Sequence, residues 1–283
     1  MVATIPLTLG APSLAAGASL HWHVWMPQTP ARAIILLAHG YAEHLGRYDH
    51  VAAHLNAQGF AVYALDHWGH GSSDGAPGFV PKFSVFTDGV ELLLAKIKAA
   101  HPDLPRFLIG HSMGGLIAAI HLQTHQSHYQ GAIISGPALM PAEEPSRVMV
   151  IISRLLSRFL PKAGVLKFDA EGVCRDPAVV ADYLADPLVY KGKMSARLAA
   201  EFFDTMAQAR AGAALITVPL LIVHGDEDRI AALPGSQYLI DHIMSADKRL
   251  IAYTGLFHEV FNEPEQAEVL AEVSSWISAH LTD

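Results

Sequence analysis

The stretch Gly110-His111-Ser112-Met113-Gly114-Gly115 decides how this chain is interpreted. The apolar residues 106–109 lead into it, and the helix-like residues 116–123 follow it. In the pattern Gly-x-Ser-x-Gly, the serine sits on a strained turn between a strand and a helix, and the flanking glycines let the backbone pass closely. We therefore predict a nucleophile elbow in which the hydroxyl of Ser112 is the nucleophile.

Apolar runs rich in β-branched residues alternate with helical patterns on both sides of this motif. This alternation predicts an α/β fold, a mainly parallel twisted sheet with helices on both faces. The expected strands are residues 20–26, 33–38, 60–65, 106–109, 132–135, 219–224 and 248–253. The expected helices are residues 48–58, 87–100, 116–123 and 265–280.

The alternation stops between residues 136 and 212, where the sequence is helical, contains many prolines and shows no clear strand. We predict a core domain of residues 1–136 and 213–283 and an inserted helical cap of residues 137–212. In an open α/β sheet the ligand site lies at the carboxyl ends of the strands. An insertion that leaves from one of these ends is therefore expected to roof the site.

A serine hydroxyl needs a base, and the base needs an acid that orients it. His224-Gly225-Asp226-Glu227-Asp228-Arg229 follows one predicted strand, and Gly255-Leu256-Phe257-His258-Glu259 follows the last. This gives the order Ser, Asp, His of α/β-hydrolases, with His258 as the base. Spacing alone does not choose between Asp226 and Asp228. The local turn favours Asp228 as the acid, with Asp226 bonded to loop amides.

Acyl transfer also needs donors for the developing oxyanion. The backbone N–H of Met113 is one candidate, because Met113 follows the nucleophile. The second is expected in the loop after an earlier strand, where His39-Gly40-Tyr41 follows residues 33–38. This makes the backbone N–H of Tyr41 the second candidate.

Four blocks of the sequence resemble those of the monoacylglycerol lipase and lysophospholipase-like group of α/β-hydrolases. They are residues 39–48 (HGYAEHLGRY), 66–75 (DHWGHGSSDG), 110–115 (GHSMGG) and 224–229 (HGDEDR). The resemblance implies hydrolysis of monoacylglycerols or similar single-chain esters by Ser112, Asp228 and His258, with Tyr41 and Met113 as the oxyanion amides. It also supports Asp228 over Asp226, because the acid of that group precedes an arginine.

Within the predicted cap, Tyr183-Leu184-Ala185-Asp186-Pro187 is similar to the Tyr-x-x-Asp-Pro segment of that group, whose tyrosine faces the glycerol end of the substrate. The resemblance therefore implies that Tyr183 binds substrate. Glu43, His44 and Arg47 lie beside the predicted oxyanion residue Tyr41, and we interpret them as a polar network that holds this loop.

A helical pattern over residues 147–160 has an apolar face that includes Ile152, Leu156 and Phe159, and arginines on the opposite face. We favour an apolar face that packs on the core or lines the acyl pocket, with these three residues as substrate contacts. The alternative is transient contact of this amphipathic helix with an anionic membrane surface.

Composition excludes several other classes of protein. The chain has 283 residues, of which 51% are hydrophobic and 16% charged, so it can bury a large core. The net charge of −8 argues against a nucleic-acid partner. The single cysteine, Cys174, excludes an intrachain disulfide framework, and no apolar run approaches the roughly 18 residues of a membrane span. We expect a soluble, cytoplasmic protein.

The sequence predicts neither a metal nor a cofactor. His67-x-x-His70 lies in a turn-rich loop without a carboxylate at metalloprotease spacing, and no Gly-x-Gly-x-x-Gly motif follows a strand. The prediction is a cofactor-independent serine hydrolase of monoacylglycerols. A broader carboxylesterase, lysophospholipase or thioesterase is the alternative with the same triad, and a non-catalytic ligand-binding protein on this fold is an alternative from a different class.

Overall fold

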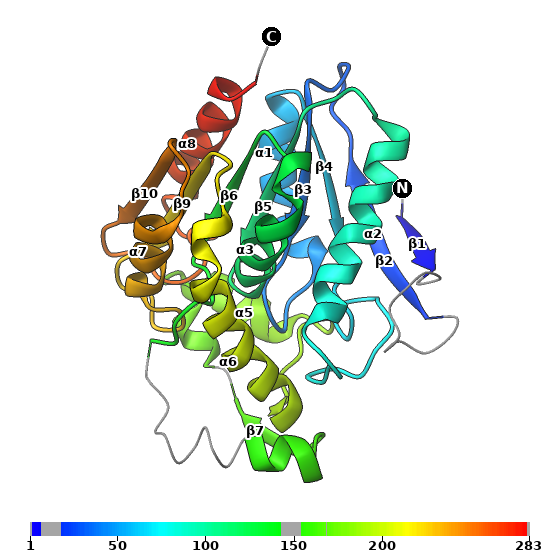
Figure 1. Cartoon of the computed structure of the whole chain (residues 1–283), viewed down its shortest axis with the longest axis vertical. Helices are drawn as coiled ribbons and strands as arrows, with labels where there is room; N and C mark the ends of the chain where they lie inside the picture. The colour runs from blue at the N-terminus through cyan, green and yellow to red at the C-terminus, as the bar shows by residue number, and fades with distance from the viewer. Residues whose placement is uncertain (1, 7–17, 143–153, 168, 282–283) are drawn as a thin grey trace.

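The structure is a computed structural model of the chain, and it describes residues 2–6, 18–142, 154–167 and 169–281. Its centre is an eight-stranded sheet with the strand order β1-β2-β4-β3-β5-β6-β9-β10 (Figure 1). The strands are β1 Val2–Pro6, β2 Ser19–Trp25, β3 Ala33–Ala38, β4 Phe60–Leu65, β5 Arg106–His111, β6 Gly131–Ser135, β9 Leu220–Gly225 and β10 Lys248–Tyr253. The pairings of β1 with β2 and of β2 with β4 are antiparallel, and the other pairings are parallel.

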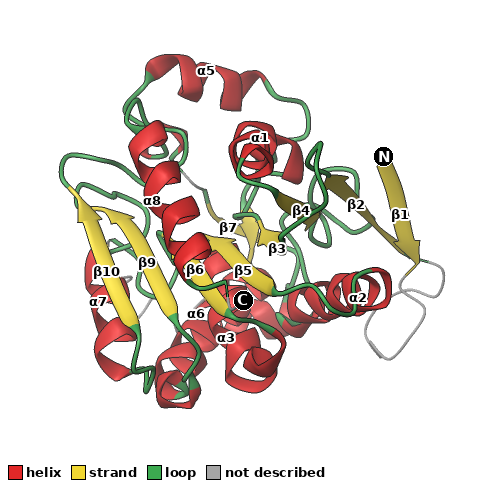
Figure 2. Ribbon diagram, turned by 90° about the horizontal axis from the view of Figure 1, so that it is seen from above, coloured by secondary structure: helices red, strands yellow, loops and turns green. Residues whose placement is uncertain are grey.

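Helices cover both faces of this sheet. The helices, including the cap helices α5 and α6, are α1 Asp49–Ala57, α2 Ser84–Ala100, α3 Met113–His125, α5 Pro177–Ala185, α6 Ala196–Ala211, α7 Leu233–His242 and α8 Gln266–Ala279. Short 3₁₀ helices span η1 Leu45–Tyr48, η2 Gln126–His128, η3 Ala170–Gly172 and η4 Ala213–Leu215. Figure 2 shows α1 and α8 on one side of the sheet and α2, α3 and α7 on the other. The predicted mainly parallel sheet with helices on both faces is confirmed.

The hydrophobic core forms two layers because every residue of the central strands β3 and β4 is buried. One layer joins residues such as Phe86 of α2 and Leu116 of α3 to one face of the sheet. The other joins residues such as Leu55 of α1 and Val273 of α8 to the opposite face. The continuous apolar runs that predicted these strands are therefore the centre of the fold.

Residues 137–212, which we call the cap segment, connect β6 to the residues before β9 and contain α5 and α6. Residues 154–159 are also helical. The sequence showed no clear strand here, whereas the structure has a short antiparallel pair, β7 Gly164–Leu166 and β8 Met194–Ser195. Strands of three and two residues are too short for an alternating pattern to be seen in the sequence.

The cap segment lies at one end of the sheet, where Figure 1 shows α5, α6 and β7 together. It is anchored through α6, because Leu198, Phe202 and Met206 belong to the same core layer as α2 and α3. Among the residues that the structure describes, no helix is long and apolar enough to cross a membrane.

Candidate active site

Ser112 lies on the turn between β5 and α3, with φ 53° and ψ −114°. The two glycines of the motif are needed because the backbone is so crowded here. A Cβ atom on Gly110 would lie 2.3 Å from the carbonyl oxygen of Gly114, and one on Gly114 would lie 2.0 Å from the carbonyl oxygen of Ala38. The turn presents the side chain of Ser112 at the carboxyl end of β5.

The structure brings Ser112, His258 and Asp228 together from the ends of three strands. Ser112 follows β5, Asp228 follows β9, and His258 follows β10. The Oγ atom of Ser112 lies 2.8 Å from Nε2 of His258, and Nδ1 of His258 lies 2.6 Å from Oδ2 of Asp228. All three side chains are buried. This chain of hydrogen bonds can move a proton from the serine hydroxyl to the imidazole.

Asp228 is held in place by its own turn. Its Oδ1 atom accepts hydrogen bonds from the backbone N–H groups of Ile230 and Ala231, at 2.8 and 2.9 Å. Its Oδ2 atom, besides contacting His258, lies 3.0 Å from Nε2 of His224. His224 is a contact of the acid that the sequence analysis did not find, and its position at the end of a buried strand gave no sign of this contact.

The side chain of Asp226 binds a backbone N–H group and not a catalytic side chain. Its Oδ1 atom accepts a hydrogen bond of 2.6 Å from the backbone N–H of Gly255, and its side chain is exposed. It therefore joins the two loops that carry Asp228 and His258. The structure places Asp228, and not Asp226, against the histidine.

The pKa values of the histidine and its acid move in opposite directions. Burial lowers the pKa of His258, but the charge of Asp228 and the hydrogen bond to it outweigh burial and raise the pKa above its ordinary value. Burial raises the pKa of Asp228, but the charge of His258 and the hydrogen bonds from both histidines hold it well below its ordinary value. Asp228 is therefore ionised at neutral pH and stabilises the imidazolium of His258.

A further buried histidine, His111, lies beside the site, with its ring 4.8 Å from that of His258. Burial, followed by the nearby His258, lowers the pKa of His111 to about 3. His111 is therefore neutral and adds no positive charge next to the base.

The two predicted oxyanion residues flank Ser112. Met113 is the first residue of α3, where backbone N–H groups are not used by the helix itself. Tyr41 lies in the loop after β3, and this loop approaches the nucleophile so closely that a Cβ atom on Gly40 would lie 3.3 Å from Cβ of Ser112. Tyr41 borders both cavities at Ser112, whereas the side chain of Met113 is buried and borders neither.

Glu43 and Arg47 form the polar network that was predicted to hold this loop. Glu43 accepts hydrogen bonds from the N–H of Gly40 at 2.6 Å and from the hydroxyl of Tyr48 at 2.7 Å. Arg47 pairs with Glu43 and makes two hydrogen bonds of 2.7 Å to Glu259, the residue after His258. The network therefore links the oxyanion loop to the loop of the catalytic base.

The same loop is tied to α5 of the cap segment. Nε2 of His44 lies 2.8 Å from Oδ2 of Asp186, at the end of α5. The guanidinium of Arg47 lies 4.7 Å from the ring centre of Tyr183, within the range of a cation–π contact. Tyr183 and Asp186 therefore join the cap segment to the loop beside the nucleophile.

Two cavities meet at Ser112. The larger, of about 490 Å³, is mixed in character, and its polar lining residues are Tyr41, Glu43, Lys167, Asp169, Glu171, Tyr183, Tyr190, Lys191 and Glu259. The smaller, of about 70 Å³, is apolar, and its lining includes Ala138, Met140, Leu166, Met194, Ala199, Phe202, Phe203 and Met206. Tyr41, Ser112 and Ile230 border both cavities. The nucleophile thus lies between a larger compartment of mixed polarity and a smaller apolar one.

The predicted substrate contacts have different outcomes. Tyr183 is buried and borders the larger cavity. Ile152 lies outside the described residues. The prediction that Phe159 lines the acyl pocket is wrong, because 72% of Phe159 is exposed and it borders neither cavity. Leu156 is half-buried and borders neither cavity.

The apolar wall comes from α6 instead. Phe202 and Met206 of this helix border the smaller cavity, and Leu198, one turn earlier, is buried in the same core layer. Their four-residue spacing is a sequence signal that could have pointed to a buried helical face, but it was not used in the prediction. Of the apolar residues between 154 and 160, Leu155, Phe159 and Leu160 are exposed, whereas Leu156 is half-buried.

A serine at a strand-to-helix elbow, with histidine and aspartate hydrogen-bonded to it at the ends of neighbouring strands, defines a serine hydrolase of the α/β-hydrolase class. Residues 29–265 match the family described as "Serine aminopeptidase, S33", and the chain belongs to this family.

The chain is 44% identical over 265 residues to the monoacylglycerol lipase of Mycolicibacterium smegmatis, covering 94% of this chain and 95% of that protein. It is 33% identical over 265 residues to the monoglyceride lipase of Mus musculus, covering 93% and 88%. The crystal structure of Paleococcus ferrophilus monoacylglycerol lipase superposes with a TM-score of 0.84 at 30% identity, covering 92% of this chain and 99% of that one. These similarities confirm the predicted fold class and the resemblance to monoacylglycerol lipases.

Proposed function

We propose that the protein hydrolyses monoacylglycerols to a fatty acid and glycerol through an acyl-enzyme on Ser112. The observation that carries the proposal is the hydrogen-bonded chain Ser112–His258–Asp228 at the junction of an apolar cavity and a cavity of mixed polarity. A substrate with one acyl chain and one small polar head matches this junction. The monoacylglycerol and monoglyceride lipases among the relatives of the chain support the same substrate.

In the first half of the reaction, Oγ of Ser112 attacks the ester carbonyl while its proton passes to Nε2 of His258. The carbonyl oxygen becomes an oxyanion, for which the backbone N–H groups of Tyr41 and Met113 are the proposed donors. His258 then gives the proton to the oxygen of the leaving glycerol, and the acyl group stays on Ser112. Asp228 keeps the imidazole in the tautomer that accepts the proton at Nε2.

In the second half, a water molecule takes the place of the glycerol. His258 accepts a proton from this water as its oxygen attacks the acyl carbonyl. The Oγ–carbonyl bond then breaks, Ser112 recovers the proton from His258, and the fatty acid leaves. The reaction therefore needs no metal or cofactor.

The cap segment, as a roof over the site, supplies the two compartments. The first carbons of the acyl chain enter the small apolar cavity beside Phe202 and Met206, and the glycerol moiety lies in the larger, mixed cavity beside Tyr183. The hydroxyl of Tyr183 is the proposed contact to a glycerol hydroxyl. Residues from α6 and α5 thus bind the two ends of the substrate.

We also propose transient contact of the cap segment with a lipid surface, and a cytoplasmic location for the protein. Leu155, Phe159 and Leu160 are 55%, 72% and 59% exposed, and the helix of residues 154–159 also carries the exposed Arg158. Apolar and cationic side chains together favour binding to an anionic lipid surface.

Sedimentation with anionic vesicles tests the contact of the cap segment with lipid. Binding is expected to weaken in Phe159→Ser, and equal binding of both proteins would contradict the contact. Cell fractionation tests the location.

The function itself is tested by labelling and product analysis. A fluorophosphonate should label Ser112, and a monoacylglycerol should yield equimolar fatty acid and glycerol. Absence of labelling would favour a ligand-binding protein on this fold. Faster cleavage of acetate or butyrate esters than of long-chain monoacylglycerols would favour a carboxylesterase. Lysophospholipid and thioester substrates in the same assay distinguish the remaining alternatives.

A further inference from the structure

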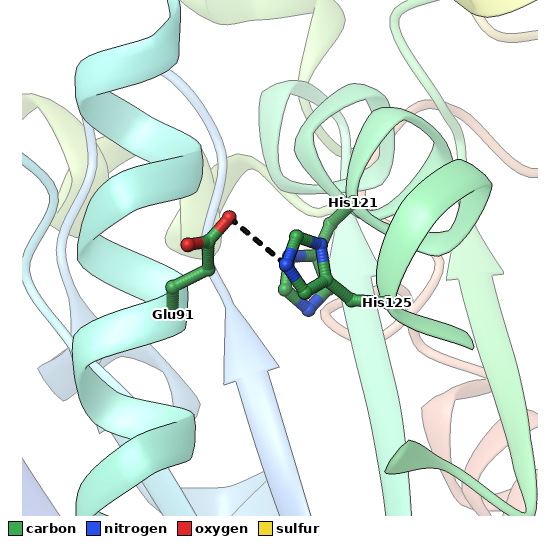
Figure 3. Close-up of side chains that lie close together, drawn as sticks. All are labelled: Glu91, His121 and His125. Atoms are coloured by element: carbon green, nitrogen blue, oxygen red, sulfur yellow. Dashed lines mark ion pairs between the residues drawn. The ribbon is translucent and has the colours of Figure 1, made fainter. Parts of the chain in front are cut away.

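Glu91, His121 and His125 form a cluster of side chains away from Ser112, between α2 and α3 (Figure 3). Each residue offers one atom that can bind a metal, and these atoms all lie within 4.8 Å of one another. His121 and His125 are four residues apart in the last turns of α3, so both project from one face of the helix. Glu91 reaches them from the neighbouring helix.

We propose that Glu91, His121 and His125 bind a divalent transition metal ion of the zinc type and thereby join α2 to α3. Two imidazoles and one carboxylate are a ligand set that suits zinc and its neighbours in the first transition row better than magnesium or calcium. In the sequence only His67 and His70 resembled a metal-binding pair, and this site was not predicted.

The distance between Glu91 and His125 fits a tetrahedral ion. Ligands about 2.0 to 2.1 Å from a tetrahedral zinc ion lie about 3.3 to 3.4 Å from one another. Nε2 of His125 lies 3.4 Å from Oε1 of Glu91, which is this spacing. The two imidazole rings are stacked and nearly parallel, with centroids 4.6 Å apart, so the rings must turn toward each other before both nitrogen lone pairs point at one ion.

The nitrogen atoms that face away from the proposed ion already have partners. Nε2 of His121 lies 3.0 Å from the hydroxyl of Tyr129, and Nδ1 of His125 lies 2.8 Å from Oγ1 of Thr124. Hydroxyl partners at these positions orient the rings, as outer-shell partners do in metal sites. The hydroxyl of Tyr129 can accept the N–H of Nε2, which leaves the lone pair of His121 on Nδ1.

Nδ1 of His121 is the second, independent indication of a ligand. His121 is only 1% exposed, and its Nδ1 atom has no hydrogen-bond partner among the described residues. A buried polar atom without a partner is costly, and a metal ion would satisfy it. Glu91 and His125 are 44% and 33% exposed at their side chains, so an ion can enter from solvent.

The site is remote from the nucleophile. His121 is nine residues beyond Ser112 along α3, which corresponds to about 13 Å. An ion there would stabilise the packing of α2 against α3 and take no part in ester hydrolysis. The inference therefore does not depend on the proposed function.

The test uses the full chain freed of metal with a chelator, with Zn²⁺ alone as the probe. Isothermal titration calorimetry is compared for the wild-type protein, His125→Ala and Glu91→Gln, because these two side chains are partly exposed and their replacement leaves the core unchanged. His242→Ala, a replacement of an exposed histidine on α7, is the matched control.

We expect one tight equivalent of Zn²⁺ in the wild-type protein and in His242→Ala. Loss of an outer-shell partner alone weakens metal binding about 10- to 100-fold, so loss of the ligand His125 should weaken it at least as much. Zn²⁺, but not Mg²⁺, should raise the melting temperature of the wild-type protein and not that of His125→Ala. Co²⁺ should give the visible absorption of a four-coordinate site.

Two results would overturn the inference. One is a wild-type protein that binds no Zn²⁺ more tightly than His125→Ala does. The other is tight binding that persists in both His125→Ala and Glu91→Gln but is lost in His242→Ala. Turnover of a soluble ester by metal-free His125→Ala should equal that of the wild-type protein, which shows that the variant is folded.

Discussion

The core and the cap segment contribute to the site in different ways. The core contributes Ser112, His258 and Asp228, each from a strand end and each buried and hydrogen-bonded to the next. The cap segment contributes side chains, such as Phe203 and Tyr183, that line the cavities and make few hydrogen bonds. A change in the core should therefore slow the hydrolysis of every ester, whereas a change in the cap segment should slow some esters and spare others.

Removal of the nucleophile should have the largest effect of all. Ser112→Ala is expected to lower kcat by about 10⁴-fold or more for every ester, because the acyl-enzyme cannot form. The melting temperature should not fall, since the serine hydroxyl supports no packing. Turnover is measured by fatty-acid release and folding by circular dichroism. A folded variant with substantial turnover would rule out Ser112 as the nucleophile.

The two aspartates after β9 give the next test of the core. Asp228→Asn should lower kcat by about 10⁴-fold, because an amide favours the wrong tautomer of His258. Asp226→Asn is the matched control, and it should mainly lower stability because Asp226 binds the N–H of Gly255. Steady-state kinetics and thermal melts of both variants separate these effects. If Asp226→Asn showed the larger kinetic loss, the acid would have to be reassigned.

The pH dependence tests the charge state of the base. His258 must be neutral to accept the serine proton, and its pKa lies above the ordinary value of about 6.5. As pH falls below this pKa, the protonated form accumulates and kcat/KM should fall about tenfold per pH unit. Activity should rise to a plateau as pH increases. An acid limb below about pH 6 would show that Asp228 does not raise the pKa of His258.

The apolar side of the cap segment should control acyl length. Phe203 is half-buried and borders the smaller cavity. Phe203→Ala should lower kcat/KM for long-chain monoacylglycerols by roughly tenfold and leave butyrate esters nearly unchanged, since each buried CH₂ contributes up to about 0.8 kcal/mol. Leu215→Ala, a change at an exposed residue outside both cavities, is the control. Equal losses on all chain lengths would place Phe203 outside the acyl path.

The polar side of the cap segment should show the smallest effect. Tyr183→Phe removes one hydroxyl and is expected to cost about 0.5 to 1.5 kcal/mol on glycerol esters, which corresponds to roughly a two- to tenfold loss in kcat/KM. Simple alkyl esters of the same acyl chain should lose less. The comparison is made with matched acyl chains, so that only the alcohol differs. Identical losses on both esters would show that Tyr183 does not contact glycerol.

The difference between the core and the cap segment also explains which parts of the fold could be predicted from the sequence. β3 and β4 have the predicted bounds because a strand buried on both faces is a continuous apolar run. Ser112, His258 and Asp228 follow strand ends, where the order of the motifs along the chain identifies them. The main elements of the core could therefore be predicted before any contact was known.

The cap segment was harder to predict because helical spacing shows which residues share a face, but not what that face contacts. Phe159 and Phe202 both belong to apolar helical faces, yet one is 72% exposed and the other is buried beside the smaller cavity. The difference lies in tertiary packing, because Phe202 belongs to the core layer of α2 and α3. His224 and the pair of His121 and His125 likewise acquire their partners only in the folded chain.

The backbone of Ser112 has a consequence for evolution. A non-glycine residue at φ 53° stores about 1 to 3 kcal/mol of conformational energy that the folded protein must carry. Glycine at this position would release that energy and abolish the nucleophile. Selection for heat resistance alone would therefore remove the catalytic serine, and a thermostable form of this hydrolase must find its extra stability at residues far from the elbow.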